Sequence, residues 1–172
     1  MKNEHELKVV SIRMVDEPPL LSDRRIRSAH DAVEVMVKEL QKYDRELFCI
    51  LNLQTNGKVI NMNVVSMGTL NTAVVSPREV FKTAILSNAA SILLVHNHPS
   101  GECSPSKEDM QVTERLIECG KLIDIPVVDH VITGREGAYY SFREHGQIFN
   151  PADYNKVAEN GIFLRKDESR KR

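Results

Sequence analysis

The sequence predicts a mixed α/β fold, in which a central mixed sheet is flanked by helices. Short apolar segments that suit strands are interleaved with amphipathic segments that suit helices. An Asn56-Gly57 pair between two of the apolar segments indicates a hairpin. A wholly apolar segment at residues 91–95 is typical of a central strand that is covered on both faces.

The size and composition of the chain indicate a globular protein. Its 172 residues are enough for one domain with its own core. Hydrophobic residues make up 41% of the chain and charged residues 27%, a balance that disordered proteins do not have. The formal net charge of -1 gives no general attraction to nucleic acid or to an anionic membrane.

The apolar runs and the cysteines bear on cellular location. No apolar run approaches the roughly 20 residues of a membrane span, and no signal-peptide core follows the polar N-terminus. Cys49, Cys103 and Cys119 are odd in number and form no C-x-x-C pair. We therefore expect reduced thiols, a cytoplasmic location and no membrane partner.

The first predicted elements are a strand and a helix. Apolar and polar residues alternate over residues 10–14, within an N-terminal extension of residues 1–27, and a pair of prolines ends this strand. Ser28 and Asp31 have the spacing of a capping box, so a helix is expected to begin there. Its expected inward side chains are Ala32, Val33, Met36 and Leu40.

The next segments predict strands. Residues 47–53 are suited to a buried strand, and the Asn56-Gly57 turn leads to a return strand over residues 58–65. A third strand is expected over residues 69–75.

A second helix is predicted to follow these strands. Ser76 suits the N-cap, Pro77 the first helical position, and Glu79 the residue that closes a capping box. The helix is expected to extend to about Asn88. Its expected inward side chains are Val80, Phe81, Ala84 and Ile85.

The second half of the chain continues the alternation. A helix is expected from near Ser106 to near Gly120, with strands over residues 125–133 and 138–143. Inward side chains of this helix are expected to be Met110, Thr113, Leu116 and Ile117. We expect one domain over residues 28–150, followed by a polar tail.

The apolar strand over residues 91–95 leads directly to a pair of histidines. In an extended backbone the side chains of His96 and His98 point to the same side, and two neutral imidazoles make half of a tetrahedral zinc site. Asp109 falls in the first turn of the next helix, and a loop over residues 99–105 that folds back can bring its carboxylate to the same ion.

Three protein ligands with an open fourth position are typical of catalytic zinc rather than structural zinc. The open position would hold a water whose pKa the metal lowers to roughly 7. Such a site also needs a general base and a donor for the oxyanion. Composition does not identify these groups, although glutamates near a strand start and a hydroxyl near the helix N-terminus are candidates.

The segment from His96 to Asp109 resembles the JAMM zinc motif of the JAB/MPN family, which reads His-x-His-Pro, six residues, Ser, two residues, Asp. Its His-Asn-His-Pro-Ser-Gly part is similar to the RadC branch of that family. The likeness extends from about Ile26 to Ile148. It includes three further segments: Asp44-Arg45-Glu46, Ser76-Pro77-Arg78-Glu79-Val80-Phe81 and Asp129-His130-Val131-Ile132-Thr133-Gly134.

The resemblance implies a JAB/MPN sandwich, similar in layout to the cytidine deaminases. It implies a zinc-dependent hydrolase that cleaves a peptide or isopeptide bond, with Zn2+ held by His96, His98 and Asp109. It implies that Glu46 acts as the catalytic general acid and base. It also implies that Ser106 is the catalytic serine, which donates to the oxyanion or steadies the bound water.

Two features depart from the family pattern. A RadC chain usually carries a helix-hairpin-helix segment ahead of this domain, and residues 1–27 leave no room for one, so we expect no such DNA-binding module. Cys103 lies in the zinc-proximal loop but is not part of the motif. Its thiolate could occupy the open zinc position and silence the enzyme until displaced or oxidised. The alternative is an inert lone cysteine.

Each residue also has a plainer interpretation. The two histidines could bond to the backbone at a strand end, and Asp109 could simply cap a helix opposite Ser106. Glu46 could belong to a solvated charged cluster before a strand. His130 follows Asp129 in a predicted strand, where the carboxylate could orient the ring in support of the metal site. The alternative for His130 is a hydrogen-bonded core residue.

Three functions compete at this point. The first is the metallopeptidase, and the second is a RadC-type scaffold or binding module in DNA repair or mobile-element biology. A zinc deaminase would need H-x-E with P-C-x-x-C, and the chain has neither. The substrate stays open, as does a homodimer, and the net charge does not indicate nucleic acid as a partner.

Overall fold

The computed structural model describes residues 25–40, 43–68 and 75–148. The expected strand over residues 10–14, the third strand over 69–75 except its last residue, and the polar tail lie outside these residues. The elements are α1 (Ala29–Leu40), β1 (Leu47–Leu53), β2 (Val59–Met67), α2 (Pro77–Leu86), β3 (Ser91–Asn97), α3 (Lys107–Leu122), β4 (Val127–Thr133), a 3-10 turn (Arg135–Gly137) and β5 (Tyr139–Ser141).

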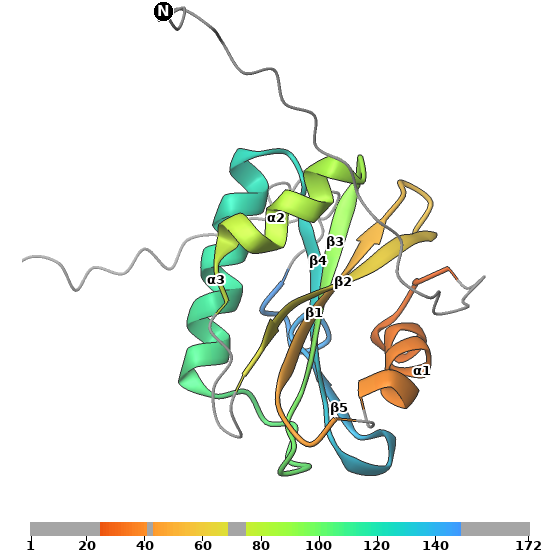
Figure 1. Ribbon diagram of the computed structural model, residues 1–172, viewed down its shortest axis with the longest axis vertical. Helices are drawn as coiled ribbons and strands as arrows, with labels where there is room; N and C mark the ends of the chain where they lie inside the picture. The colour runs from red at the N-terminus through yellow and green to blue at the C-terminus, as the bar shows by residue number, and fades with distance from the viewer. Residues whose placement is uncertain (1–24, 41–42, 69–74, 149–172) are drawn as a thin grey trace, which may run out of the picture.

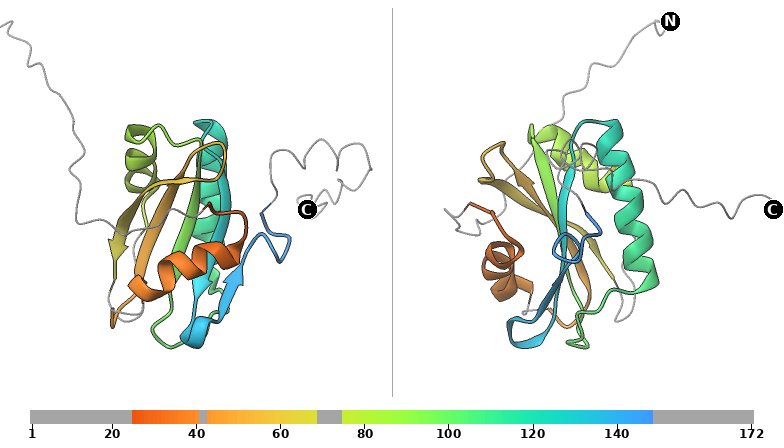
Figure 2. Two further views of the ribbon diagram at one scale, coloured as in Figure 1. Left: turned by 90° about the vertical axis from the view of Figure 1, so that its right-hand side faces the viewer. Right: turned by 180° about the vertical axis from the view of Figure 1, so that it is seen from behind.

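The five described strands form one sheet in the order β2-β1-β3-β4-β5. β3 pairs antiparallel with β1 and parallel with β4, while β2 and β5 are antiparallel to their neighbours. Helix α1 covers one face of the sheet, and α2 and α3 cover the other (Figures 1 and 2). The predicted mixed α/β class, with helices flanking a mixed sheet, is confirmed.

Side chains of the central strand β3 alternate between two cores. Leu93 and Val95 pack with α1, whereas Ile92 and Leu94 pack with α2 and α3. Every residue of β1 is buried as well, because this strand is covered on both faces. The strand that leads to the two histidines is therefore held in the middle of the sheet and shielded on both sides.

The predicted start of α1 is confirmed in detail. The Asp31 amide donates to Ser28 Oγ at 3.2 Å, and the Ser28 amide donates to Asp31 Oδ2 at 2.9 Å, which completes a capping box. All four side chains that were expected to face inward are buried: Ala32, Val33, Met36 and Leu40.

The hairpin between β1 and β2 is also as predicted. Gly57 has a φ of 78°, in the left-handed region that favours glycine. The Gln54 amide donates to the Lys58 carbonyl at 2.9 Å and closes the turn. A Cβ on Gly57 would lie 2.7 Å from the Ile26 carbonyl oxygen, so the turn also packs against the segment that precedes α1.

Helix α2 differs from its prediction at both ends. Ser76 is the N-cap but its side chain makes no capping hydrogen bond, and the Glu79 side chain pairs with Lys82. The helix ends at Leu86, before Asn88, which has a φ of 50°. Ile85 is 56% exposed, because the helix contacts the sheet only through Val80, Phe81 and Ala84.

Helix α3 begins after Ser106, as predicted, and faces the sheet through a different set of residues. Met110 is 42% exposed, and Ile117 is half-buried, so only part of the expected face is correct. The buried stripe of the helix consists of Asp109, Thr113, Leu116 and Gly120. This stripe places the carboxylate of Asp109 against the end of β3.

The described helices include none long and apolar enough to cross a membrane.

We expect Gly120→Ala to destabilise the fold, although alanine normally favours a helix by about 1 kcal/mol over glycine. A Cβ at this position would lie 2.6 Å from the Ile125 carbonyl oxygen and 3.4 Å from Phe81 Cζ. Relief of this clash needs a shift of α3 against the turn that follows it and against α2, which should lower the free energy of unfolding by about 1–3 kcal/mol, measured by urea denaturation. Glu118→Ala on the exposed side of the same helix is the control, with a change within about 0.5 kcal/mol. Equal stability of Gly120→Ala and the parent chain would contradict this close packing.

Candidate metal centre

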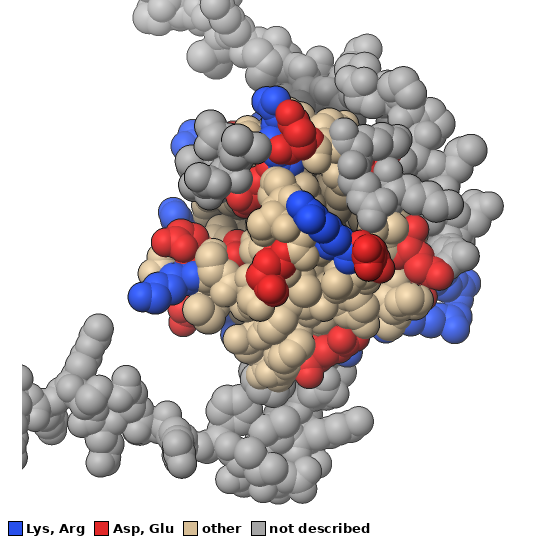
Figure 3. Space-filling model, turned by 90° about the horizontal axis from the view of Figure 1, so that it is seen from below, with Lys and Arg blue, Asp and Glu red and all other residues tan. Residues whose placement is uncertain are grey.

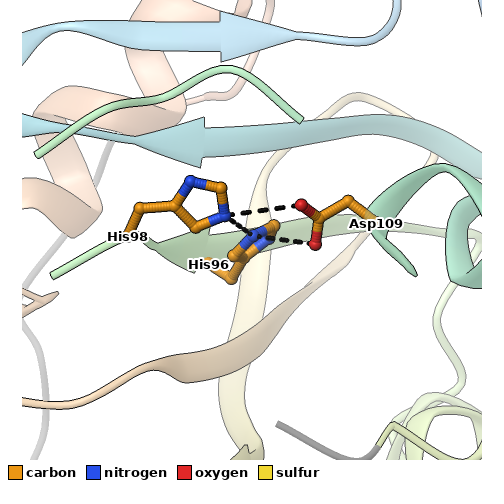
Figure 4. A group of neighbouring side chains, drawn as sticks. All are labelled: His96, His98 and Asp109. Atoms are coloured by element: carbon orange, nitrogen blue, oxygen red, sulfur yellow. Dashed lines mark hydrogen bonds and ion pairs between the residues drawn. The ribbon is translucent and has the colours of Figure 1, made fainter. Parts of the chain in front are cut away.

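The centre lies where β3 ends and α3 begins. The His98 amide donates to the Thr133 carbonyl at 3.1 Å, so the pairing of β3 with β4 continues one residue beyond the strand. The backbone therefore stays extended through His96 and His98, and their rings lie on the same side. Figure 4 shows both rings turned toward the carboxylate of Asp109.

Three side chains converge on one point. His96 Nε2 lies 2.9 Å from His98 Nε2 and 3.2 Å from Asp109 Oδ1, and His98 Nε2 lies 3.4 Å from Asp109 Oδ2. Because zinc binds nitrogen and oxygen at about 2.0–2.1 Å, the ligand atoms of a tetrahedral site lie about 3.3–3.4 Å apart. The two distances to the carboxylate are close to this value, while the distance between the two Nε2 atoms is shorter, and the three side chains form a group that could hold a metal ion.

The loop between the histidines and α3 is fixed by two glycines. Gly101 has a φ of 88°, and a Cβ there would lie 2.4 Å from Cγ of the Arg135 side chain. A Cβ on Gly134 would lie 2.5 Å from the Gly101 carbonyl oxygen. The loop thus packs without room for a side chain against the segment that follows β4. This contact holds the loop that joins His98 to α3 against the segment that follows β4.

Ser106 and Asp109 form the capping box of α3. The Ser106 amide and hydroxyl both donate to Asp109 Oδ2, at 2.7 and 2.6 Å, and the Asp109 amide donates to Ser106 Oγ at 3.0 Å. Burial would raise the pKa of Asp109, but hydrogen bonds with His96, His98 and Ser106 outweigh it and hold the pKa far below its usual range. The capping role and the position beside the two rings coexist, as the sequence had left open.

A backbone carbonyl orients the ring of His98. Its Nδ1 lies 2.7 Å from the Glu102 carbonyl oxygen, which can only accept, so Nδ1 carries the hydrogen. Nε2 then faces Asp109. A hydrogen bond with Asp109 raises the pKa of His98 against the effect of partial burial, and the charge of Glu46 acts in the same direction.

A third histidine supports His96 from behind. His130 is fully buried, and its Nε2 lies 2.8 Å from His96 Nδ1. Its own Nδ1 lies 2.6 Å from Thr113 Oγ1. Burial and the neighbouring His96 lower the pKa of His130 well below its usual range, so this ring is neutral.

Asp129 does not orient the ring of His130. Its carboxylate accepts from the His130 backbone amide at 2.7 Å, from Ser141 Oγ at 2.7 Å and from the Arg143 amide at 3.0 Å. The reason is the strand geometry, since neighbouring side chains of β4 point to opposite faces of the sheet. Asp129 thus joins β4 to β5, and the ring contact of His130 goes to the metal centre instead.

Glu46 lies directly before β1 and is half-buried. The amide side chain of Asn97 spans it, donating to the Arg45 carbonyl at 3.1 Å and accepting from the Leu47 amide at 2.9 Å. Sequence reasoning missed Asn97, although its place between two histidines puts its side chain on the opposite face of the strand. A buried amide there needs partners, and it finds them on both sides of Glu46.

Cys103 is half-buried and packs against the core that α2 and α3 form with the sheet. A Cβ on Gly134 would lie 3.4 Å from the Cβ of Cys103. Among the described residues, the Cys103 sulfur makes no hydrogen bond to His96, His98 or Asp109. Its predicted regulatory role stays a prediction.

Space for a ligand borders the centre. A cavity of about 380 Å³ has a lining that includes His98, Pro99 and Arg135. A larger cavity of about 710 Å³ is lined mainly by α3 and includes Thr113 and Ile148. The smaller cavity is the one that reaches a residue of the converging group.

Comparison with known proteins agrees with this geometry. Residues 26–147 match the model of a family described as RadC-like JAB domain. A UPF0758 protein of Methanosarcina mazei is 44% identical over 134 residues, which are 78% of this chain and 56% of the relative. A UPF0758 protein of Bacillus mycoides is 46% identical over 123 residues, or 72% of this chain and 54% of the relative.

The chain thus spans about half the length of the curated relatives it matches. The match of the family model covers well over half of the 172 residues and contains all three converging side chains. The resemblance that the His-x-His-Pro segment indicated is confirmed, and the chain belongs to the RadC-like JAB domain family.

Proposed function

We propose that this chain is a zinc-dependent hydrolase of the JAMM type, which cleaves a peptide or isopeptide bond. The observation that carries the proposal is that His96 Nε2, His98 Nε2 and the Asp109 carboxylate meet at one point. Two nitrogens, one carboxylate and a free fourth position are the ligand set of catalytic zinc rather than structural zinc.

The hydrogen bonds around the rings support metal binding. His98 Nδ1 donates to a carbonyl, so a neutral His98 ring presents the lone pair of Nε2; His96 Nδ1 lies 2.8 Å from His130 Nε2, and a hydrogen on His96 Nδ1 leaves the Nε2 of a neutral His96 ring equally available to a metal. Two lone pairs 2.9 Å apart, with a carboxylate beside them, repel one another unless a cation or a proton lies between them. A divalent cation satisfies all three groups at once.

A zinc ion bound here would supply a Lewis acid, which lowers the pKa of a water to about 7 and polarises the carbonyl of an amide. We assign Glu46 the proton transfer, as the base that takes a proton from the attacking water and then returns it to the leaving amine. The hydroxyl of Ser106, which here donates to Asp109, is assigned to the oxyanion of the substrate. The cavity beside His98 and Pro99, which is also lined by Asn97, borders one of the three ligands and is the proposed place for the substrate chain.

The alternative is a RadC-type DNA-repair module with a scaffold role and little or no activity. A scaffold has no need of a complete ligand set, and all three ligand positions are filled here. Figure 3 shows the end of the molecule to which β3 leads, where the described acidic and basic side chains are interspersed. This mixture does not suit a phosphate backbone, which binds to clustered Lys and Arg.

We also propose a cytoplasmic location. All three cysteines are free, as is usual for proteins of reducing compartments.

Purified full-length chain should contain about one zinc per molecule by elemental analysis. His98→Ala and Asp109→Ala should each lose most of this zinc, because either change leaves only two ligands. His30→Ala is the matched control, since His30 is an exposed residue of α1, and it should keep the metal. Absence of zinc from the parent chain, or its retention in both ligand variants, would refute the metal centre.

Glu46→Gln should keep zinc but slow hydrolysis by about 10²- to 10⁴-fold, because the amide cannot accept a proton. A panel of peptides and of lysine-linked isopeptides, followed by mass spectrometry, measures this rate. Asp44→Asn, two residues away on the exposed surface, is the control and should cleave at the parent rate. If Glu46→Gln is as active as the parent, the assigned acid/base is wrong. If the zinc-loaded parent chain cleaves no member of the panel, the scaffold role is favoured over the hydrolase.

A further inference from the structure

Behind His96, two buried polar residues form a chain of hydrogen bonds that ends on α3. His130 Nε2 lies 2.8 Å from His96 Nδ1, and His130 Nδ1 lies 2.6 Å from Thr113 Oγ1. The Thr113 hydroxyl in turn donates to the Asp109 carbonyl at 2.5 Å. We call these two residues, Thr113 and His130, the relay.

Counting hydrogens fixes the direction of each bond. The Thr113 hydroxyl has one hydrogen, and the Asp109 carbonyl, which can only accept, takes it. The oxygen of Thr113 must therefore accept from His130 Nδ1–H. A neutral imidazole has a single N–H, so His130 Nε2 is an acceptor, and it takes the hydrogen of His96 Nδ1. His96 is left with its lone pair on Nε2, on the side of Asp109.

Among the described residues, the two nitrogens of His130 and the Nδ1 of His96 have no hydrogen-bond partner outside this chain of bonds. His96 and His130 are both fully buried. His130 is stacked on Phe142, with ring centroids 4.8 Å apart, and is tilted against Phe48 at 5.4 Å. Phe48 is also stacked on His96. Apolar rings therefore exclude water from the relay, so its hydrogens cannot be exchanged for bonds to solvent.

We propose that Thr113 and His130 are positioning residues, which hold His96 in the tautomer whose Nε2 lone pair binds the metal. The inference rests on the proposed function, because it assigns a purpose to a ligand of the same metal. Partners of this kind typically change metal affinity by about 10- to 100-fold when they are lost. His98 needs no such device, since a backbone carbonyl fixes its tautomer directly.

The relay also joins two ligands that come from different elements. One hydroxyl bonds the main chain of Asp109 in the first turn of α3, and through His130 it sets the hydrogen of His96 in β3. A change at Thr113 therefore acts on both ligands without touching the metal. This gives an experiment in which no ligand is replaced.

Thr113→Val and Thr113→Ser are the test pair. Valine keeps the shape of threonine but cannot accept from His130, whereas serine keeps the hydroxyl. Zinc affinity of the full-length chain is measured by competition with a chromophoric chelator, and thermal unfolding is measured without metal. Thr113→Val should bind zinc about 10- to 100-fold more weakly, and Thr113→Ser should stay close to the parent. Valine leaves the buried Nδ1–H of His130 without an acceptor and should lower the metal-free melting temperature, so zinc affinity is compared at a temperature at which both variants are folded.

Long-range ¹H–¹⁵N spectra of the imidazoles in the parent chain provide a readout that does not depend on any variant. The proposal requires the hydrogen of His130 on Nδ1 and that of His96 on Nδ1. A hydrogen on His130 Nε2 overturns it, even if Thr113→Val fails to fold. If the parent chain binds zinc and Thr113→Val binds it with equal affinity, the role of the relay is overturned and the metal centre is left intact. Parent chain that binds no zinc overturns the proposed function itself.

Discussion

The extended backbone of β3 through His98 is the constraint on which the centre depends. Antiparallel pairing with β1 and parallel pairing with β4 hold the strand, and the bond from the His98 amide to the Thr133 carbonyl carries this pairing past its last residue. Because successive side chains of a strand point to opposite faces, His96 and His98 point toward α3 and Asn97 points toward α1. One stretch of regular backbone thus supplies two candidate ligands on one face and the amide that spans Glu46 on the other.

The third candidate ligand depends on a helix terminus rather than on a strand. The capping box places the Asp109 carboxylate over the first turn of α3, where the hydroxyl and amide of Ser106 already bind one of its oxygens. Close packing of Gly101 against Gly134 then sets how the helix start approaches the strand end. A carboxylate fixed in this way stays ionised, which agrees with its strongly lowered pKa.

Features that depend on nearby residues could be predicted from the sequence. The Asn56-Gly57 hairpin, the capping box at Ser28 and the buried strand before His96 all follow from short patterns, and all are present. Ile85 and Met110 were placed inside because they lie one residue beside the true buried stripes. Hydrophobic periodicity predicts the buried face of a helix to within about one residue, and the contacts with the sheet determine which of the neighbouring residues is buried.

Contacts between distant segments could not be predicted in the same way. Asn97 and Leu47 are bonded across a pair of strands, and Thr113 meets His130 only when α3 lies on β4. For His130 the sequence left two interpretations open, a ring oriented by Asp129 and a hydrogen-bonded core residue, and the ring is buried and bonds to a hydroxyl from a helix. Such pairs have no fixed spacing, so only the fold reveals them.

The two hydrogen bonds that Asn97 makes around Glu46 connect two distant parts of the chain. They join the segment before β1 to the end of β3, so every residue assigned a chemical role is anchored within one sheet and the helix beside it. Within the part of the chain that the structure describes, the hydrogen bonds that position these groups lie between residues 45 and 133. The distance between Glu46 and the two histidines is therefore set by the register of β1 with β3 and not by the length of the loops between them.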